Sequence, residues 1–347
     1  MITTIESQVL QALETFLTII LPEQRKEGME IFFYEAFEDE ANTLRSLLGN
    51  EFTFGFAPET ILEAGHRNPP ARLISIRTQS VVPVEWVDQL DGVLSRSTGY
   101  DHLMAMSSRI GGRLPLGYLE EYATRAVAEH ALLLTMALLR KLPQQMRQFP
   151  VFNREDLTGV ECEGKNLLVV GVGRIGSEIV KVAKGLGFVV KGVDIVPDKR
   201  DVVYLAKEEG IRWADVIVCA MNLTAENRGY FNYDLLSRAK KGCTFVNIAR
   251  GELSPPGDLE RLLEEGKLAG LGLDVFEDEG SLGAALRSPG TGLSSQAAQV
   301  NRILSYPNVV LTPHNAFNSC EALQRKSALT VQQIRHFFKH RDFLWKV

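Results

Sequence analysis

The chain has 347 residues, of which 45% are hydrophobic and 23% are charged, and its formal net charge is −5. This composition is typical of an ordinary globular protein that is long enough for two domains with large cores. The acidic balance gives no reason to expect nucleic-acid binding, and no apolar run reaches the roughly 18 residues that a membrane span needs.

The N-terminal region contains a fairly apolar stretch at residues 9–21. Glu14 interrupts it and no basic segment precedes it, so we expect an amphipathic helix rather than a signal peptide. Beyond it, the first third of the chain alternates short apolar runs with helical patterns, which is typical of a small parallel α/β unit. The predicted strands are residues 31–34, 52–54, 73–76 and 92–94, and the predicted helices are residues 41–48 and 84–89.

The middle of the chain begins with its strongest helical pattern, residues 121–142, which is rich in Ala and Leu and is ended by Pro143. A second series of strands and helices starts at Lys165 and matches a doubly wound dinucleotide-binding domain. Its predicted strands are residues 167–170, 189–193, 216–219, 244–248, 271–275 and 309–311. Residues 280–299 are rich in Gly, Ser and Ala and predict a long loop. Residues 322–339 predict a final amphipathic helix.

The turn after the first strand of this second series carries the glycine pattern GVGRIG at residues 171–176. Gly171 would permit the tight turn, Gly173 would let the backbone approach a pyrophosphate, and Gly176 would let the helix pack closely on the strand. Asp194 ends the next predicted strand, where its carboxylate would accept hydrogen bonds from ribose hydroxyls and repel a 2′-phosphate. Strand, glycine turn, helix and acid together predict a site for NAD rather than NADP.

Three later strands are each followed by ionisable side chains: Arg250, the acidic segment from Asp274 to Glu279, and His314. Because ligands bind outside the carboxyl ends of such strands, we expect these side chains to converge. A guanidinium can bind a carboxylate through two hydrogen bonds and polarise the neighbouring carbonyl. Histidine can exchange a hydroxyl proton, and a carboxylate bonded to it holds its tautomer. The pattern predicts hydride transfer to or from a 2-oxo acid.

These motifs, in this order and at about this spacing, resemble the D-isomer-specific 2-hydroxyacid dehydrogenase family, which includes D-lactate, glyoxylate/hydroxypyruvate and 3-phosphoglycerate dehydrogenases. The resemblance runs from about residue 73 to residue 316. It implies two Rossmann- or flavodoxin-like, doubly wound parallel-sheet domains, with an NAD domain (122–317) inserted into a discontinuous substrate domain (1–121 and 318–347). It also implies NAD as the cofactor, a small 2-oxo acid or D-2-hydroxy acid as the substrate, and a homodimer.

The resemblance further implies that Arg250 binds and polarises the substrate, that His314 is the acid/base and that Glu279 is its partner. Asp274 would help to orient this group. The residues expected to bind the cofactor are Gly171, Gly173, Arg174, Ile175, Gly176, Asp194, Asn222, Ala249 and Asp274. The substrate carboxylate would be held by backbone N–H groups of Ser97, Thr98 and Gly99 together with Arg250.

The chain departs from the family pattern at two places near the expected pocket. Residues 220–224 replace the usual His-x-Pro-Leu-Thr, and Gly280 replaces the proline after the acid. The segments at residues 116–121 and 280–299 also look longer than in the family pattern. The sequence therefore does not identify the side chain of the substrate. We expect His130, on the long helix, to be a packing residue and Arg77 to be a solvated loop residue.

Two other functions remain open on the same scaffold. One is a formate- or phosphite-type dehydrogenase, although formate oxidation needs no acid/base pair. The other is a non-catalytic, NADH-sensing interaction module. The four cysteines lie far apart without a histidine at ligand spacing, so we expect free thiols in a cytoplasmic protein and no metal site.

Overall fold

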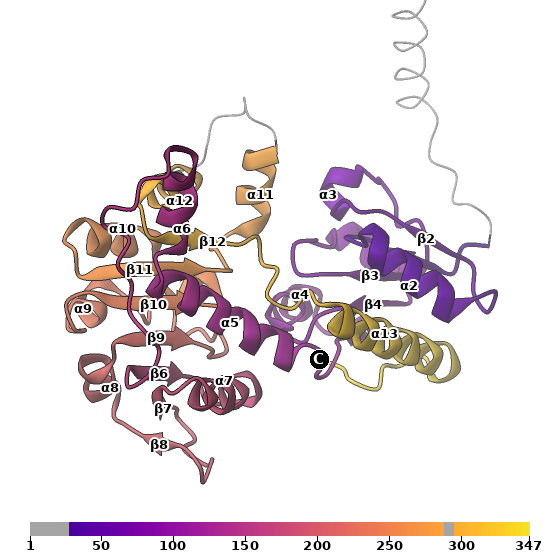
Figure 1. The fold of residues 1–347 in the computed structure, drawn as a ribbon. Helices are drawn as coiled ribbons and strands as arrows, with labels where there is room; N and C mark the ends of the chain where they lie inside the picture. Colours follow the sequence, from indigo (N-terminus) through magenta and orange to yellow (C-terminus); the bar gives the residue numbers. More distant parts are fainter. Residues whose placement is uncertain (1–27, 288–294) are drawn as a thin grey trace, which may run out of the picture. The chain divides into compact units, whose positions relative to one another are not determined.

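The computed structural model describes residues 28–287 and 295–347 (Figure 1). They form two compact units: the described residues up to Glu120 together with Lys326–Val347, and those within Glu121–Arg325. Each unit contains one parallel β-sheet with helices packed on it. The prediction of two doubly wound α/β sheets is therefore confirmed. The helix expected at residues 9–21 lies outside the described residues.

The first unit is built on a five-stranded parallel sheet in the order β2-β1-β3-β4-β5, the flavodoxin-like order. Its strands are β1 (Ile31–Phe33), β2 (Phe54–Phe56), β3 (Leu73–Ile76), β4 (Gly92–Ser95) and β5 (Leu116–Gly117). Its helices are α2 (Glu38–Leu48), α3 (Ile61–Ala64), η1 (Val84–Gln89), α4 (Asp101–Ile110) and most of α13 (Cys320–His340). The C-terminal part of the chain thus completes a unit that the N-terminal part begins.

The second unit has a seven-stranded parallel sheet in the order β12-β11-β10-β9-β6-β7-β8. This is the Rossmann strand order with one further strand at an edge, and the order reverses between β6 and β9. Its strands are β6 (Asn166–Val170), β7 (Val189–Val193), β8 (Val203–Tyr204), β9 (Val216–Cys219), β10 (Cys243–Asn247), β11 (Leu268–Leu273) and β12 (Val309–Leu311). The central strands are almost wholly buried, as expected where helices cover both faces of a sheet.

Ten helical segments lie in the described part of the second unit, several of them on the faces of the sheet (Figure 1). They are α5 (Thr124–Leu139), α6 (Leu142–Gln148), η2 (Phe149–Val151), α7 (Arg174–Gly185), α8 (Lys207–Trp213), α9 (Tyr233–Leu236), η3 (Gly251–Leu253), α10 (Pro256–Glu264), α11 (Glu279–Arg287) and α12 (Ser295–Ser305). Among the helices of residues 28–287 and 295–347, none is both long and apolar enough to cross a membrane.

The helix predicted at residues 121–142 differs from the structure for an identifiable reason. The single helix expected at residues 121–142 ends at Leu139, because Lys141 adopts a left-handed backbone with φ 51°. Pro143 then lies in the first turn of α6, where proline is tolerated, so it starts a helix as well as excluding continuation of the previous one.

The long loop predicted at residues 280–299 is wrong as a secondary-structure assignment. Most of α11 and the first turn of α12 lie in this range, on either side of residues that are not described. Leu282, Ala297 and Val300 form a small buried apolar cluster. The loop was predicted because this range is rich in glycine and serine. The helices form because apolar residues within it pack against each other.

Candidate active site

The three glycines of the turn after β6 meet three different steric demands. Gly171 has φ 91°, and a Cβ there would lie 2.5 Å from the backbone of Met221, which follows β9. A Cβ on Gly176 would lie 1.9 Å from the carbonyl oxygen of Gly171, so only glycine lets α7 start so close to the turn. Gly173 has no atom within 4 Å of its Cβ position. The space left open at this N-terminus of α7 fits a pyrophosphate group.

Asp194, at the end of β7, is tied to this glycine turn. Its Oδ2 accepts the N–H of Val172 at 2.5 Å, and its Oδ1 accepts the N–H of Val196 at 2.9 Å. The carboxylate is therefore held at the turn between β6 and α7, where a ribose of a dinucleotide would lie beside the pyrophosphate.

The remaining predicted cofactor residues surround the same end of the sheet. Arg174 and Ile175 form the first turn of α7, and Arg174 Nε lies 3.6 Å from Glu121 Oε2. Asn222 is exposed in the segment after β9, where its carbonyl oxygen accepts a hydrogen bond from Asn227 Nδ2 at 2.7 Å. Ala249 follows β10 and is half-buried.

Arg250 is carried by a loop that Asn247 organises from the end of β10. The buried Asn247 amide donates to the Arg250 carbonyl and to Ser254 Oγ, both at 2.8 Å, while its oxygen accepts the Ala249 N–H at 3.0 Å. Arg250 Nη1 donates to the Ala249 carbonyl at 2.8 Å. The loop is thus rigidly placed by one buried amide, with the half-buried guanidinium at its start.

Gly251, directly after the arginine, lets this loop approach the segment after β11. A Cβ at Gly251 would lie 1.9 Å from the carbonyl carbon of Phe276 and 2.1 Å from the Glu277 nitrogen. Only glycine allows this approach, which brings the arginine loop against the chain that leads to Glu279. No role was assigned to Asn247 or Gly251 from the sequence. The signals were a polar residue ending a strand of buried residues and a glycine directly after an ionisable one.

His314 and Glu279 are in direct contact. His314 Nδ1 lies 2.7 Å from Glu279 Oε2, although the two residues are 35 positions apart. Glu279 Oε1 also accepts the Phe276 N–H at 3.1 Å, which orients the carboxylate toward the ring. Both side chains are mostly buried, with exposed fractions of 22% for His314 and 17% for Glu279. With Nδ1 engaged, Nε2 is the ring nitrogen available to a substrate.

Asp274 is completely buried at the end of β11 and binds the backbone around His314. Its carbonyl oxygen accepts the His314 N–H at 2.8 Å. Its carboxylate oxygens accept the N–H groups of Asn315 at 2.8 Å and Ala316 at 2.9 Å. His314 has φ 48°, a left-handed conformation that costs free energy in a residue other than glycine and persists where the surroundings impose it. The hydrogen bonds that Asp274 accepts from the N–H groups of His314 and of the two following residues supply that constraint.

The loop Ser97–Thr98–Gly99 follows β4 of the first unit and is fixed by side-chain hydrogen bonds. Ser97 Oγ donates to the Gly99 carbonyl at 2.8 Å and lies 2.6 Å from Ser95 Oγ. Thr98 Oγ1 donates to the Glu120 carbonyl at 2.9 Å. These bonds use side-chain hydroxyls, so they shape a compact turn without consuming its backbone N–H groups.

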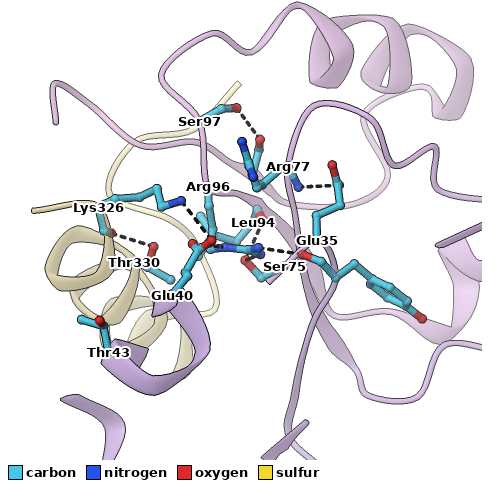
Figure 2. A network of polar contacts seen from close by, with 12 residues as sticks. Glu35, Glu40, Thr43, Ser75, Arg77, Leu94, Arg96, Ser97, Lys326 and Thr330 are labelled. Atoms are coloured by element: carbon cyan, nitrogen blue, oxygen red, sulfur yellow. Dashed lines mark hydrogen bonds and ion pairs between the residues drawn. The ribbon is translucent and has the colours of Figure 1, made fainter. Parts of the chain in front are cut away.

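A buried ion cluster lies directly beneath this loop (Figure 2). Arg96 donates from Nε to Glu40 Oε1 at 2.8 Å, and Lys326 Nζ lies 3.0 Å from Glu40 Oε2. Arg96 also donates to Ser75 Oγ at 3.1 Å and to the Tyr34 carbonyl at 2.6 Å. The cluster therefore joins β4, α2 and α13, and Arg96 immediately precedes the Ser97 loop.

The charges in this cluster act strongly on one another. Burial raises the pKa of the Glu40 carboxyl, but Arg96, Lys326 and Arg77 together outweigh burial and hold that pKa at about 2 instead of 4.5. Burial lowers the pKa of Lys326 to about 8 from 10.5, and attraction to Glu40 offsets only part of this effect. One buried carboxylate thus faces several cations beneath the Ser97 loop.

Comparisons with known proteins give a consistent result. A family model described as the NAD binding domain of D-isomer specific 2-hydroxyacid dehydrogenases matches residues 131–316. The D-3-phosphoglycerate dehydrogenase of Bacillus subtilis is 31% identical over 226 residues, which cover 62% of this chain but only 39% of that protein. The 2-hydroxyacid dehydrogenase homolog 2 of Schizosaccharomyces pombe is 28% identical over 72% of this chain and 80% of its own length.

Solved structures agree with the fold described above. A D-lactate dehydrogenase from Aquifex aeolicus, solved with NAD and lactic acid, superposes with a TM-score of 0.79 at 24% identity and covers 91% of this chain and 99% of its own. A pyruvate reductase of Chlamydomonas reinhardtii superposes with the same TM-score at 25% identity, over 92% of this chain and 99% of its own.

Proposed function

Because the chain belongs to the D-isomer specific 2-hydroxyacid dehydrogenase family and uses NAD, we propose that it reduces a small 2-oxo acid to the D-2-hydroxy acid. The observation that carries this proposal is the 2.7 Å contact between His314 Nδ1 and Glu279 Oε2. Such a pair suits a reaction in which a carbonyl oxygen takes up a proton. The close approach of the Arg250 loop to the segment before Glu279 supports it further.

Each of the three charged groups has a distinct part in the proposed reaction. Arg250 binds the substrate carboxylate and polarises the adjacent carbonyl. His314, as the imidazolium, gives its Nε2 proton to the carbonyl oxygen during reduction and takes it back during oxidation. Glu279 keeps the proton on Nδ1 and stabilises the imidazolium. Bound NADH supplies the hydride to the carbonyl carbon, so that one hydride and one proton complete the alcohol.

We assign the second unit to NAD and the first unit to the substrate, with the borders expected near residues 122 and 317. The glycine turn, Asp194, Asn222, Ala249 and the end of β11 would form the cofactor site. The backbone N–H groups of Ser97, Thr98 and Gly99 would bind the substrate carboxylate, and the cations beneath that turn would favour an anion there. We expect the enzyme to work in the reducing cytoplasm, since its four cysteines are free thiols.

The test is the oxidation of NADH in the presence of glyoxylate, pyruvate, hydroxypyruvate, 4-methyl-2-oxopentanoate and phenylpyruvate, with chiral analysis of the product. We expect turnover of at least one acid, with the D-2-hydroxy acid as the product. A protein that binds NADH in a direct titration and turns over none of these acids would not have the proposed function.

Two further assays separate the alternatives. Reduction of NAD by formate or by phosphite would identify a different hydride donor, and the His314–Glu279 contact disfavours formate because its oxidation releases no hydroxyl proton. Capture of a partner protein that depends on NADH, in a protein without turnover, would identify an interaction module.

We also propose that the protein forms a homodimer through the segment that follows α5. Five large apolar side chains are exposed within eleven positions there, and a concentrated exposed apolar surface usually marks an association site. They are Leu142 (43% exposed), Met146 (68%), Phe149 (73%), Val151 (78%) and Phe152 (74%).

A further inference from the structure

A series of partly buried hydrogen bonds connects α5 to the segment that carries His314. His130 Nε2, on α5, lies 3.1 Å from Thr312 Oγ1. Thr312 Oγ1 donates to Asp274 Oδ1 at 2.6 Å. A carboxylate only accepts hydrogen bonds, so the single hydroxyl proton of Thr312 points to Asp274. The Thr312 oxygen must therefore accept from His130, whose Nε2 carries the proton.

This series of hydrogen bonds continues from Asp274 to the backbone next to His314. Asp274 Oδ1, which accepts from Thr312, also accepts the Asn315 N–H, and Oδ2 accepts the Ala316 N–H. These two amides directly follow His314, whose backbone is held in the left-handed region. The fully buried Asp274 carboxylate therefore holds the backbone that directly follows His314, and Thr312 donates a hydrogen bond to that carboxylate.

Two independent contacts thus place His314. Glu279 binds the ring at Nδ1, whereas Asp274 accepts hydrogen bonds from the backbone N–H groups of His314 and of the two residues that follow it. His130 is half-buried and also lies 3.6 Å from Asp274 Oδ1. His130, expected to be a satisfied packing histidine, thus makes a directed polar contact through its ring.

We propose that Thr312 and His130 are positioning residues for His314, acting through Asp274. The inference rests on the proposed acid/base role of His314. Neither residue touches the reacting atoms. Their effect is to hold the Asp274 carboxylate, and with it the left-handed backbone that presents His314 Nε2. A displacement of a catalytic group by about 1 Å can lower the rate by about 100-fold. Loss of these hydrogen bonds should therefore have a measurable effect on kcat.

The central test compares Thr312→Val with Thr312→Ser. Valine keeps the shape and loses the hydroxyl, whereas serine keeps the hydroxyl and loses a methyl group. We expect Thr312→Val to lower kcat by about 10- to 100-fold in protein that remains folded. Thr312→Ser should retain kcat within about threefold. Equal losses in the two variants, or a wild-type kcat in Thr312→Val, would overturn the proposal. Should Thr312→Val not fold, Thr312→Ala against Thr312→Ser provides the same comparison.

A double-mutant cycle tests whether the two residues act as one chain. His130→Leu should also lower kcat, and the double variant with Thr312→Val should be no slower than the slower single variant, because residues of one network are not additive. Fully additive losses would show that His130 and Thr312 act separately, which contradicts the proposal.

Hydrogen exchange separates this inference from the proposed function. The Asn315 and Ala316 amides should exchange at least about tenfold faster in Thr312→Val than in the wild type and in Thr312→Ser, whether or not the protein turns over a 2-oxo acid. Absence of turnover by the wild type would contradict the proposed function, but the exchange rates would still test the positioning role. Unchanged exchange at both amides would contradict the positioning role of Thr312 and His130 and would leave the proposed function unaffected.

Discussion

At the residue scale, two substitutions in the glycine turn should affect stability and cofactor binding separately. Gly176→Ala places a Cβ 1.9 Å from a carbonyl oxygen, whereas Gly173→Ala places one in open space. We expect Gly176→Ala to lower the melting temperature, because backbone must move to admit the methyl group. Gly173→Ala should keep the melting temperature of the protein without cofactor and weaken NADH binding, because the methyl group occupies the space for the pyrophosphate.

Melting curves and NADH titrations of both variants check this prediction. Gly185→Ala is a matched control, since Gly185 also lies on α7 and has no atom within 4 Å of its Cβ position. It should leave the Kd for NADH unchanged and should not lower the melting temperature. A Gly173→Ala variant with the wild-type affinity for NADH would show that the dinucleotide does not approach this turn.

The acid/base pair gives a second prediction at the same scale. His314→Ala should lower kcat by about 10²- to 10⁴-fold while the Kd for NADH stays unchanged, since the ring is assigned to proton transfer rather than to cofactor binding. Glu279→Gln keeps the size of its side chain and removes the charge, so kcat should fall less than in His314→Ala. Steady-state kinetics with fluorescence titration of NADH give both quantities. Near-normal turnover of His314→Ala would rule out the acid/base role.

At the element scale, the proposed dimer surface consists of the large apolar side chains that α6, η2 and the following Phe152 leave exposed. The double variant Phe149→Ser with Phe152→Ser should shift the protein from a dimer toward a monomer. Leu62→Ser, at an 87% exposed position on α3, is the control and should leave the dimer intact. Sedimentation velocity measures the mass in solution. A wild-type protein that stays monomeric at every concentration tested would contradict the dimer.

The strands also show which element bounds the local sequence pattern predicts and which it does not. Strands such as Leu73–Ile76 and Val216–Cys219 match their predicted bounds because each is a short run of apolar and mostly β-branched or leucine residues. The two-residue strands β5 and β8 were not predicted, because two residues carry no periodicity. The strand predicted at residues 52–54 lies at Phe54–Phe56, since pairing with β1 sets its register.

At the scale of the whole molecule, the ion cluster of Glu40, Arg96 and Lys326 joins distant parts of the chain into the first unit. Glu40 has a folded-state pKa of about 2 against an ordinary 4.5. A carboxyl with a lowered pKa contributes stability that is present above the unfolded-state pKa and is lost as the pH falls from 4.5 to about 2. The contribution should therefore be complete at neutral pH.

The corresponding prediction concerns Glu40→Gln. The variant leaves buried cations without their carboxylate, so its free energy of unfolding at pH 7 should be lower by about 3–5 kcal/mol. The difference from the wild type should shrink as the pH falls from 4.5 to about 2. Urea unfolding across this range measures it. Glu51→Gln, which breaks the exposed pair with Arg335, should cost at most about 1 kcal/mol. A difference that does not change with pH would contradict the linkage.

The sequence by itself determined the fold class, the family and the cofactor, and it named Arg250, Glu279 and His314 as candidates. These conclusions follow from local properties: alternating apolar runs, the steric demands of adjacent glycines, and motifs in a fixed order. The tertiary structure decided the contacts, because they join residues that the strand order brings together from distant positions. The His314–Glu279 pair, the approach of Gly251 to Phe276 and the chain from His130 to Asp274 all depend on adjacent ends of parallel strands or on a helix packed against them. Spacing along a chain carries no information about such neighbours until the order of strands in the sheet is known.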